Sequence, residues 1–219
     1  MDSAVRVRVE DLGRFRERSG ELVPVVPTLC ELLPARGLRR GSTVAVAPTT
    51  GASSLLVALV AGASRANGWC AAVGMPELGA MWAAEMGMAL DRLAAVPQPG
   101  RWWPTTVAAL LEGVDVVLVR PSERPTAREM RRLTARARER GAVLVVAGPW
   151  EGAELRLAVT ASRWQGVGMG HGHLRARELR VRAEGRGAAA RPREATLWLP
   201  GPGSGPGPGA VADPGVVAA

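Results

Sequence analysis

The chain has 219 residues, of which 47% are hydrophobic, so it is long and apolar enough for one folded domain and too apolar for a disordered protein. All 28 basic residues are arginine and none is lysine, a usage typical of a GC-rich genome, and the formal net charge is +8. This balance allows an acidic partner or weak nucleic-acid binding, although scattered arginines also simply solvate helix faces.

Few residues are suited to metal binding or to membrane insertion. Cys30 and Cys70 are the only cysteines, and their wide spacing indicates neither a metal site nor a disulfide framework. His171 and His173 lie in a glycine-rich turn without a third ligand, so we favour an exposed turn over a metal site. The N-terminus is not an apolar signal region, and no run of 18 apolar residues occurs. We expect a soluble cytoplasmic protein with no membrane contact.

The predicted elements alternate between strand and helix. Residues 1–22 are charged, and we expect residues 1–27 to form an N-terminal arm or small helix. In the predicted core, residues 28–184, the strands are continuous apolar runs, which favours a parallel sheet covered on both faces. We expect helices at 28–33, 55–66, 78–90 (with Met81, Trp82, Met86 and Leu90 as its apolar positions), 105–112 and 126–140, and strands at 42–47, 69–73, 93–96, 114–119 and 142–147.

The pattern changes after Pro149. Two alternating segments, 155–164 and 174–183, are predicted to be antiparallel strands that complete the sheet. Residues 185–219 are rich in Gly, Pro and Ala and are predicted to form a flexible tail. The apolar segment Leu197-Trp198-Leu199 inside this tail is either a short recognition segment for a partner or an accident of codon usage. The predicted fold class is α/β.

A segment resembling a phosphate-binding loop follows the first buried strand. The P-loop pattern is G-x-x-x-x-G-K-[ST], and it needs a strand before the loop and a helix after it. Here Gly51 is the second glycine, Val46 stands at the first, Ala52 at the lysine and Ser53 at the Mg²⁺ ligand. Alanine cannot neutralise phosphate charge. The candidate degenerate loop comprises Pro48, Thr49, Thr50, Gly51, Ala52, Ser53 and Ser54.

Several further motifs, in order, resemble the RecA-type ATPase core over about residues 28–183. They are the glycine-rich approach at 32–41, the segment Gly74-Met-Pro-Glu77, the passage 78–97, and the helix and strand at 105–120. The resemblance places the water-activating glutamate at Glu77 and the metal-holding carboxylate at Arg120. Since arginine repels Mg²⁺, the resemblance implies a protein that neither hydrolyses ATP nor needs a cofactor. Anion binding by the helix-start amides and a substitute role for the Arg120 cation stay open.

The losses at this site, together with residues 163–173, resemble one subfamily, the actinobacterial ImuA-type proteins. That resemblance implies a non-catalytic adaptor that supports damage-induced, mutagenic translesion DNA synthesis. The implied partners are ImuB (an inactive Y-family polymerase relative), an error-prone C-family polymerase, the sliding clamp and RecA, with nucleoid association after DNA damage. The alternative hypotheses for the function are a nucleotide-binding or RecA-modulating regulator and a non-specific single-stranded DNA-binding protein.

Some exposed side chains are candidates for DNA or partner contacts. Trp102 and Trp103 are adjacent in a loop at the sheet's carboxyl edge, beside Arg101, so one of them is exposed or both cap the core. The arginines of helix 126–140 form either a binding face or a solvated one. The better candidate for nucleic-acid binding is the basic cluster of the last strand. Because this cluster lacks interleaved aromatic residues, we expect it to bind without recognising a base sequence. Its members are Arg175, Arg177, Arg180 and Arg182.

Overall fold

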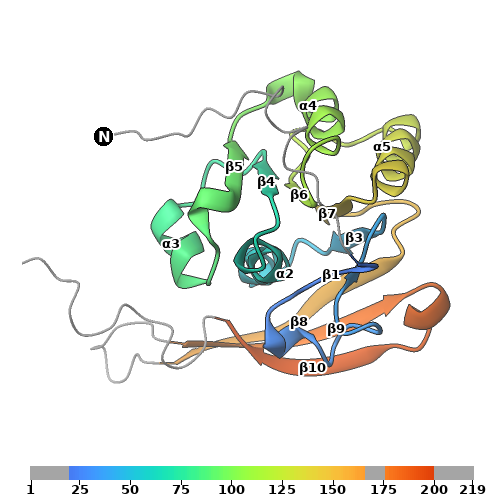
Figure 1. The fold of residues 1–219 in the computed structure, drawn as a ribbon. Helices are drawn as coiled ribbons and strands as arrows, with labels where there is room; N and C mark the ends of the chain where they lie inside the picture. The colour runs from blue at the N-terminus through green and yellow to red at the C-terminus, as the bar shows by residue number, and fades with distance from the viewer. Residues whose placement is uncertain (1–19, 166–175, 200–219) are drawn as a thin grey trace, which may run out of the picture.

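A computed structural model describes residues 20–165 and 176–199 as one large sheet flanked by helices, with a small two-stranded sheet beside it (Figure 1). The strands are β1 (Leu22–Val23), β2 (Leu38–Arg39), β3 (Thr43–Val46), β4 (Cys70–Val73), β5 (Leu93–Val96), β6 (Val116–Val119), β7 (Val143–Ala147), β8 (Leu155–Gln165), β9 (Ala176–Gly185) and β10 (Arg193–Trp198). The α-helices are α2 (Ala52–Arg65), α3 (Ala80–Glu85), α4 (Trp103–Leu110) and α5 (Ala127–Arg140). Short 3-10 helices, labelled η, are η2 (Pro27–Leu29), η3 (Leu90–Arg92), η4 (Gly100–Trp102) and η5 (Gly187–Ala189).

The large sheet has eight strands in the order β10-β9-β8-β3-β7-β6-β4-β5. The strands from β8 to β5 pair in parallel, and β9 and β10 complete the sheet in antiparallel pairing. The predicted α/β class, with a mostly parallel sheet and antiparallel strands at its C-terminal end, is therefore confirmed.

Both faces of the parallel strands are covered. In β3, Val44 and Val46 pack on the side of α2, whereas Ala45 packs on the side of α4 and α5. In Figure 1, α4 and α5 lie together on one side of the sheet and α2 on the other. Every residue of β3, β4 and β6 is buried, which explains why these strands are uninterrupted apolar or small-residue runs.

The helix predicted at 78–90 is shorter than expected. It ends at Glu85 because Gly87 adopts φ 88°, and the amides of Gly87 and Met88 bond back to Ala84 and Ala83. Met81, expected on the apolar side of this helix, is 78% exposed. The prediction that Met81 packs inward was therefore wrong, because a helix of six residues has too few turns for a complete buried stripe.

The flexible tail predicted from residue 185 begins too early. After η5, strand β10 pairs with β9 over its whole length, and the Leu199 amide donates to the Arg177 carbonyl at 2.8 Å. Leu197 and Leu199 are buried against the core on the α2 side. The apolar island is thus the inward-facing part of an edge strand, and the prediction of an exposed recognition segment is corrected. Residues 200–219 lie outside the described residues.

The boundary predicted at residue 27 also differs. Strand β1 pairs with β2, and Val23 and Val25 are buried in the core. Gly62 of α2 is packed so closely on this segment that a Cβ there would lie 2.3 Å from the Val25 carbonyl carbon. Residues 22–25 are therefore part of the folded core, and residues 1–19 lie outside the described residues.

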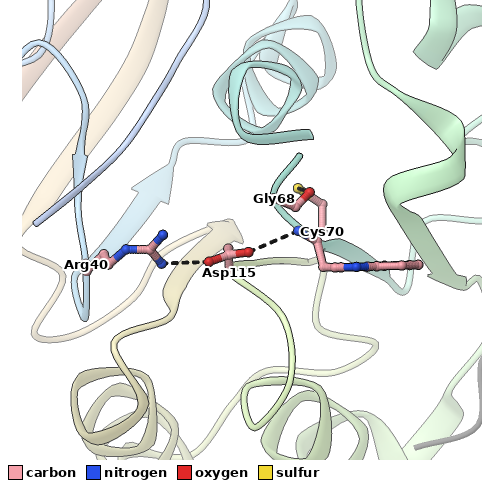
Figure 2. A network of polar contacts seen from close by, with 5 residues as sticks. Arg40, Gly68, Cys70 and Asp115 are labelled. Atoms are coloured by element: carbon pink, nitrogen blue, oxygen red, sulfur yellow. Dashed lines mark hydrogen bonds and ion pairs between the residues drawn. The ribbon is translucent and has the colours of Figure 1, made fainter. Parts of the chain in front are cut away.

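A polar network holds the amino end of the sheet together (Figure 2). Arg40 Nη1 donates to Asp115 Oδ1 at 2.7 Å, and the Trp69 amide donates to Asp115 Oδ2 at 3.0 Å. Both charged side chains are mostly buried, at 17% and 14% exposure. These contacts explain why Asp115 stands in the otherwise apolar stretch 114–119. Its carboxylate ties the segments that precede β3, β4 and β6 to one another. Burial, with a smaller contribution from the Asp115 charge, raises the pKa of the nearby Cys70 thiol.

Candidate functional site

The degenerate loop lies at the carboxyl end of β3 and leads into α2, which is the strand–loop–helix arrangement that the sequence predicted. Two of its amides form hydrogen bonds within the loop. The Thr49 amide donates to the Ala47 carbonyl at 2.8 Å, and the Ala52 amide donates to the Thr49 carbonyl at 2.9 Å. A phosphate cradle needs such amides free to point at the ligand. At these two positions the loop closes on itself instead.

Strand β9 packs against this loop. Gly51 adopts φ 101°, and a Cβ there would lie 2.7 Å from Leu179 Cδ2 and 3.5 Å from the Arg177 guanidinium carbon. Arg177 is held in place because its Nε donates to Ser162 Oγ at 2.8 Å and its guanidinium lies 5.0 Å from the Trp164 ring. Partial burial lowers the pKa of Arg177 below its ordinary value. The sequence did not single out Ser162 or Trp164, and only their cross-strand register with β9 identifies them.

The two positions assigned to acidic catalysis meet in space. Glu77 follows β4 and Arg120 follows β6, and these strands are neighbours in the sheet. Arg120 Nη1 forms an ion pair with Glu77 Oε1. The cation at the metal position therefore neutralises the carboxylate that the resemblance assigned to water activation. The residues present do not fit a Mg²⁺–nucleotide group, because the loop offers no cation at Ala52 and the metal position holds a paired arginine.

The two adjacent tryptophans divide between core and surface. Trp103 is 1% exposed and packs among the residues under α4, whereas Trp102 is 62% exposed. The Arg101 guanidinium carbon lies 5.0 Å from the centroid of the Trp102 ring. Of the alternatives that the sequence left open, an exposed aromatic residue beside a cation is the one observed.

The basic cluster predicted on the last strand is divided by the alternation of β9. Arg177 faces the loop, whereas Arg180 and Arg182 are exposed. Arg182 is paired with Glu184 at 3.4 Å and lies opposite Glu194 of β10. The described part of the cluster therefore does not form one continuous cationic surface. Arg175 lies outside the described residues, as do His171 and His173.

Two negative observations apply to residues 20–165 and 176–199. No helix within these ranges has both the length and the apolarity needed to cross a membrane. Within the same ranges, no three His, Cys, Asp or Glu side chains gather into a group that could hold a metal ion.

The order and direction of the strands, with helices on both faces, describe a RecA-like α/β domain. The crystal structure of the flagellar accessory protein FlaH from Methanocaldococcus jannaschii has a similar fold. Its TM-score is 0.54 at 14% identity, and the match covers 81% of this chain and 94% of that one. A similarity at this identity shows the fold alone.

The chain belongs to the MT3502 N-terminal domain family, whose model matches residues 31–152, more than half of its length. It is also similar to the "Uncharacterized protein Rv3395c" of Mycobacterium tuberculosis, with 42% identity over 143 residues. That alignment spans 64% of this chain and 65% of the relative, which is less than two thirds of the relative's length.

Proposed function

We propose that this protein is a non-catalytic RecA-like adaptor that supports mutagenic translesion DNA synthesis through protein–protein contacts. The observation that carries the non-catalytic part is the ion pair between Arg120 and Glu77. A metal held at this position needs an uncompensated carboxylate, and a water-activating glutamate needs a free one. Arg120 supplies no carboxylate to a metal, and the Glu77 carboxylate is paired with Arg120 in a partly exposed ion pair.

The loop supports the same proposal. A P-loop lysine acts as a point charge on the β- and γ-phosphates, and Ala52 supplies none. Arg177 is the cation nearest to Gly51 among those that the structure places there, but Ser162 and Trp164 hold its guanidinium. Arg120, considered from sequence as a substitute cation, is neutralised by Glu77. We therefore expect neither turnover nor tight nucleotide binding.

The adaptor role rests on the sequence resemblance to ImuA-type proteins and is tested in cells. A strain lacking this protein should show fewer damage-induced mutations, and the native chain should restore them. The variants Ser53→Ala and Glu77→Gln should restore them equally well, because neither residue takes part in chemistry. Loss of mutagenesis with either variant, at normal protein levels, would favour a working nucleotide site. Recovery of ImuB with the tagged protein from damaged cells tests the physical contact, and its absence would contradict the adaptor role.

A nucleotide-binding regulator without turnover is the main rival. Equilibrium dialysis with labelled ATP and Mg²⁺ separates the two functions. The adaptor proposal predicts equal ATP concentrations on both sides of the membrane, whereas the regulator predicts saturable retention.

A further inference from the structure

We propose that the corner of the molecule where α4 and α5 begin binds single-stranded nucleic acid, with Trp102 as the stacking surface. We call this surface the Trp102 corner and define it by five residues, Arg101, Trp102, Arg124, Arg128 and Arg131. It goes beyond the adaptor function, because it adds a nucleic-acid contact, and it is independent of whether the loop binds nucleotide.

The burial of Trp103 leaves the adjacent Trp102 on the protein surface. Trp103 is the largest of the fully buried side chains in the described part of the core, and it fixes the start of α4. Trp102 precedes it in η4 and therefore projects from the end of the helix, 62% exposed. A tryptophan this exposed presents a large apolar ring face to the solvent, where a base can stack on it. Arg101 stacks on the ring and leaves the pair as a flat, cationic platform.

The cations of the corner come together through the topology of the sheet. Helix α4 follows β5 and helix α5 follows β6, and both strands run toward the same edge, so both helices begin there. Figure 1 shows α4 and α5 side by side. At their far ends, Glu112 pairs with Arg136 and Arg140, which confirms that the helices run in the same direction. Packed helices are about 8–10 Å apart between their axes, so the backbones at the starts of α4 and α5 are neighbours at this corner.

These arginines are available for a ligand. Arg124, Arg128 and Arg131 are exposed, and none has a carboxylate within ion-pair distance among residues 20–165 and 176–199. Glu129 does not cancel them, because its carboxylate accepts hydrogen bonds from the Thr126 amide and hydroxyl, both at 2.8 Å. By contrast, Arg182 on β9 has Glu184 as a partner. The start of α5 therefore carries several exposed arginines without an ion pair, with Glu123 as the neighbouring exposed acid.

The combination favours an unpaired strand over the other acidic ligands. Aromatic side chains stack on bases that are not already stacked, and arginines beside them bind the phosphates. A duplex would engage the arginines but leave Trp102 without a base to cover. An acidic peptide would likewise use the charges alone. Loss of binding on removing the ring, at unchanged charge, is thus the property that identifies a single strand.

The test uses the full chain and fluorescein-labelled dT20 and U20, followed by anisotropy at low salt. Trp102→Ala should weaken binding to either oligonucleotide by roughly tenfold or more, because one base loses its stacking partner. Trp102→Phe should retain most of the affinity. Trp164→Ala is the matched control, because Trp164 is also partly exposed beneath an arginine, on β8. Comparison of dT20 with U20 shows which nucleic acid is preferred.

The charges are tested on one helix. Arg128→Glu should weaken binding several-fold and reduce the slope of log affinity against log salt, whereas Arg138→Glu, at the other end of α5, should change neither. The proposal would be overturned if Trp102→Ala bound dT20 and U20 as the native chain does. It would also be overturned if duplex DNA or polyglutamate bound as tightly as dT20 with the same loss in Trp102→Ala. These results do not depend on ATP, so they are distinguishable from failure of the adaptor function.

Discussion

Arg120 and Glu77 form an ion pair across the carboxyl ends of neighbouring strands β6 and β4. In a RecA-type ATPase, the corresponding positions hold a metal and activate a water. Here each neutralises the other. Only Arg120 departs from the ATPase pattern at these two positions, yet its ion pair also engages the retained Glu77.

Asp115 should contribute far more to stability than its single charge suggests. Asp115→Ala leaves the mostly buried Arg40 guanidinium without its partner and removes the acceptor of the Trp69 amide. We expect a loss of about 3–5 kcal/mol in the free energy of unfolding, measured by urea denaturation. Asp115→Asn, which keeps an acceptor, should lose less. Equal, small losses in both variants would contradict the network.

Gly62→Ala tests the packing of the N-terminal segment. Alanine normally stabilises a helix interior by about 1 kcal/mol relative to glycine. In α2, however, the new methyl would lie 2.3 Å from the backbone of Val25, so we expect a lower thermal midpoint. Gly79→Ala is the control, because a Cβ there meets nothing within 4 Å. A rise in the midpoint for Gly62→Ala would mean that residues 22–25 do not pack on α2.

Leu197→Ala tests the C-terminal strand. Leu197 is 3% exposed and packs in the core, so its truncation should cost about 2–5 kcal/mol in urea unfolding. Thr196→Ala, at an exposed position of the same strand, should change stability by less than about 0.5 kcal/mol. Equal losses of stability in the two variants would indicate that residues 193–198 form part of a flexible tail and not a strand of the sheet.

The start of α5 should give a measurable pH dependence. The pKa of Glu129 lies below its ordinary value, chiefly because the Thr126 amide and then the Thr126 hydroxyl bond its carboxylate. A depressed pKa contributes stability above the unfolded value, near 4.3, and this is lost as the pH falls through the folded pKa. Thr126→Ala should therefore cost about 1 kcal/mol at pH 7 and less at pH 3. Urea unfolding at pH 7, 5, 4 and 3 measures this, and a difference that grows toward pH 3 would contradict the capping box.

Continuous apolar runs predicted the parallel strands well, because such runs occur where both faces of a strand are covered. The sequence failed where packing depends on distant partners. Leu197 lies among prolines and glycines, yet pairing with β9 orders it. Met81 follows a helical pattern, yet Gly87 ends the helix before a second buried turn forms. Local composition carries no information about either partner.

The candidate site shows the same division. The missing lysine at Ala52 is visible in the sequence, because it is a departure from a fixed pattern. The contact of Arg177 with Gly51 is not, since the two residues lie more than a hundred positions apart and meet through the register of β8 and β9. The sequence left open whether one of the adjacent tryptophans is exposed or both cap the core, and the structure distinguishes these by exposing Trp102 and burying Trp103.

Isothermal calorimetry, with ATP and Mg²⁺ titrated into the purified chain, is the sharpest check on the proposed loss of nucleotide binding. We expect no saturable heat up to millimolar ATP, and the same trace with or without Mg²⁺, because Ala52 supplies no cation to the phosphates and Arg120 no carboxylate to the metal. Saturable, Mg²⁺-dependent binding that is lost in Ser53→Ala would contradict it.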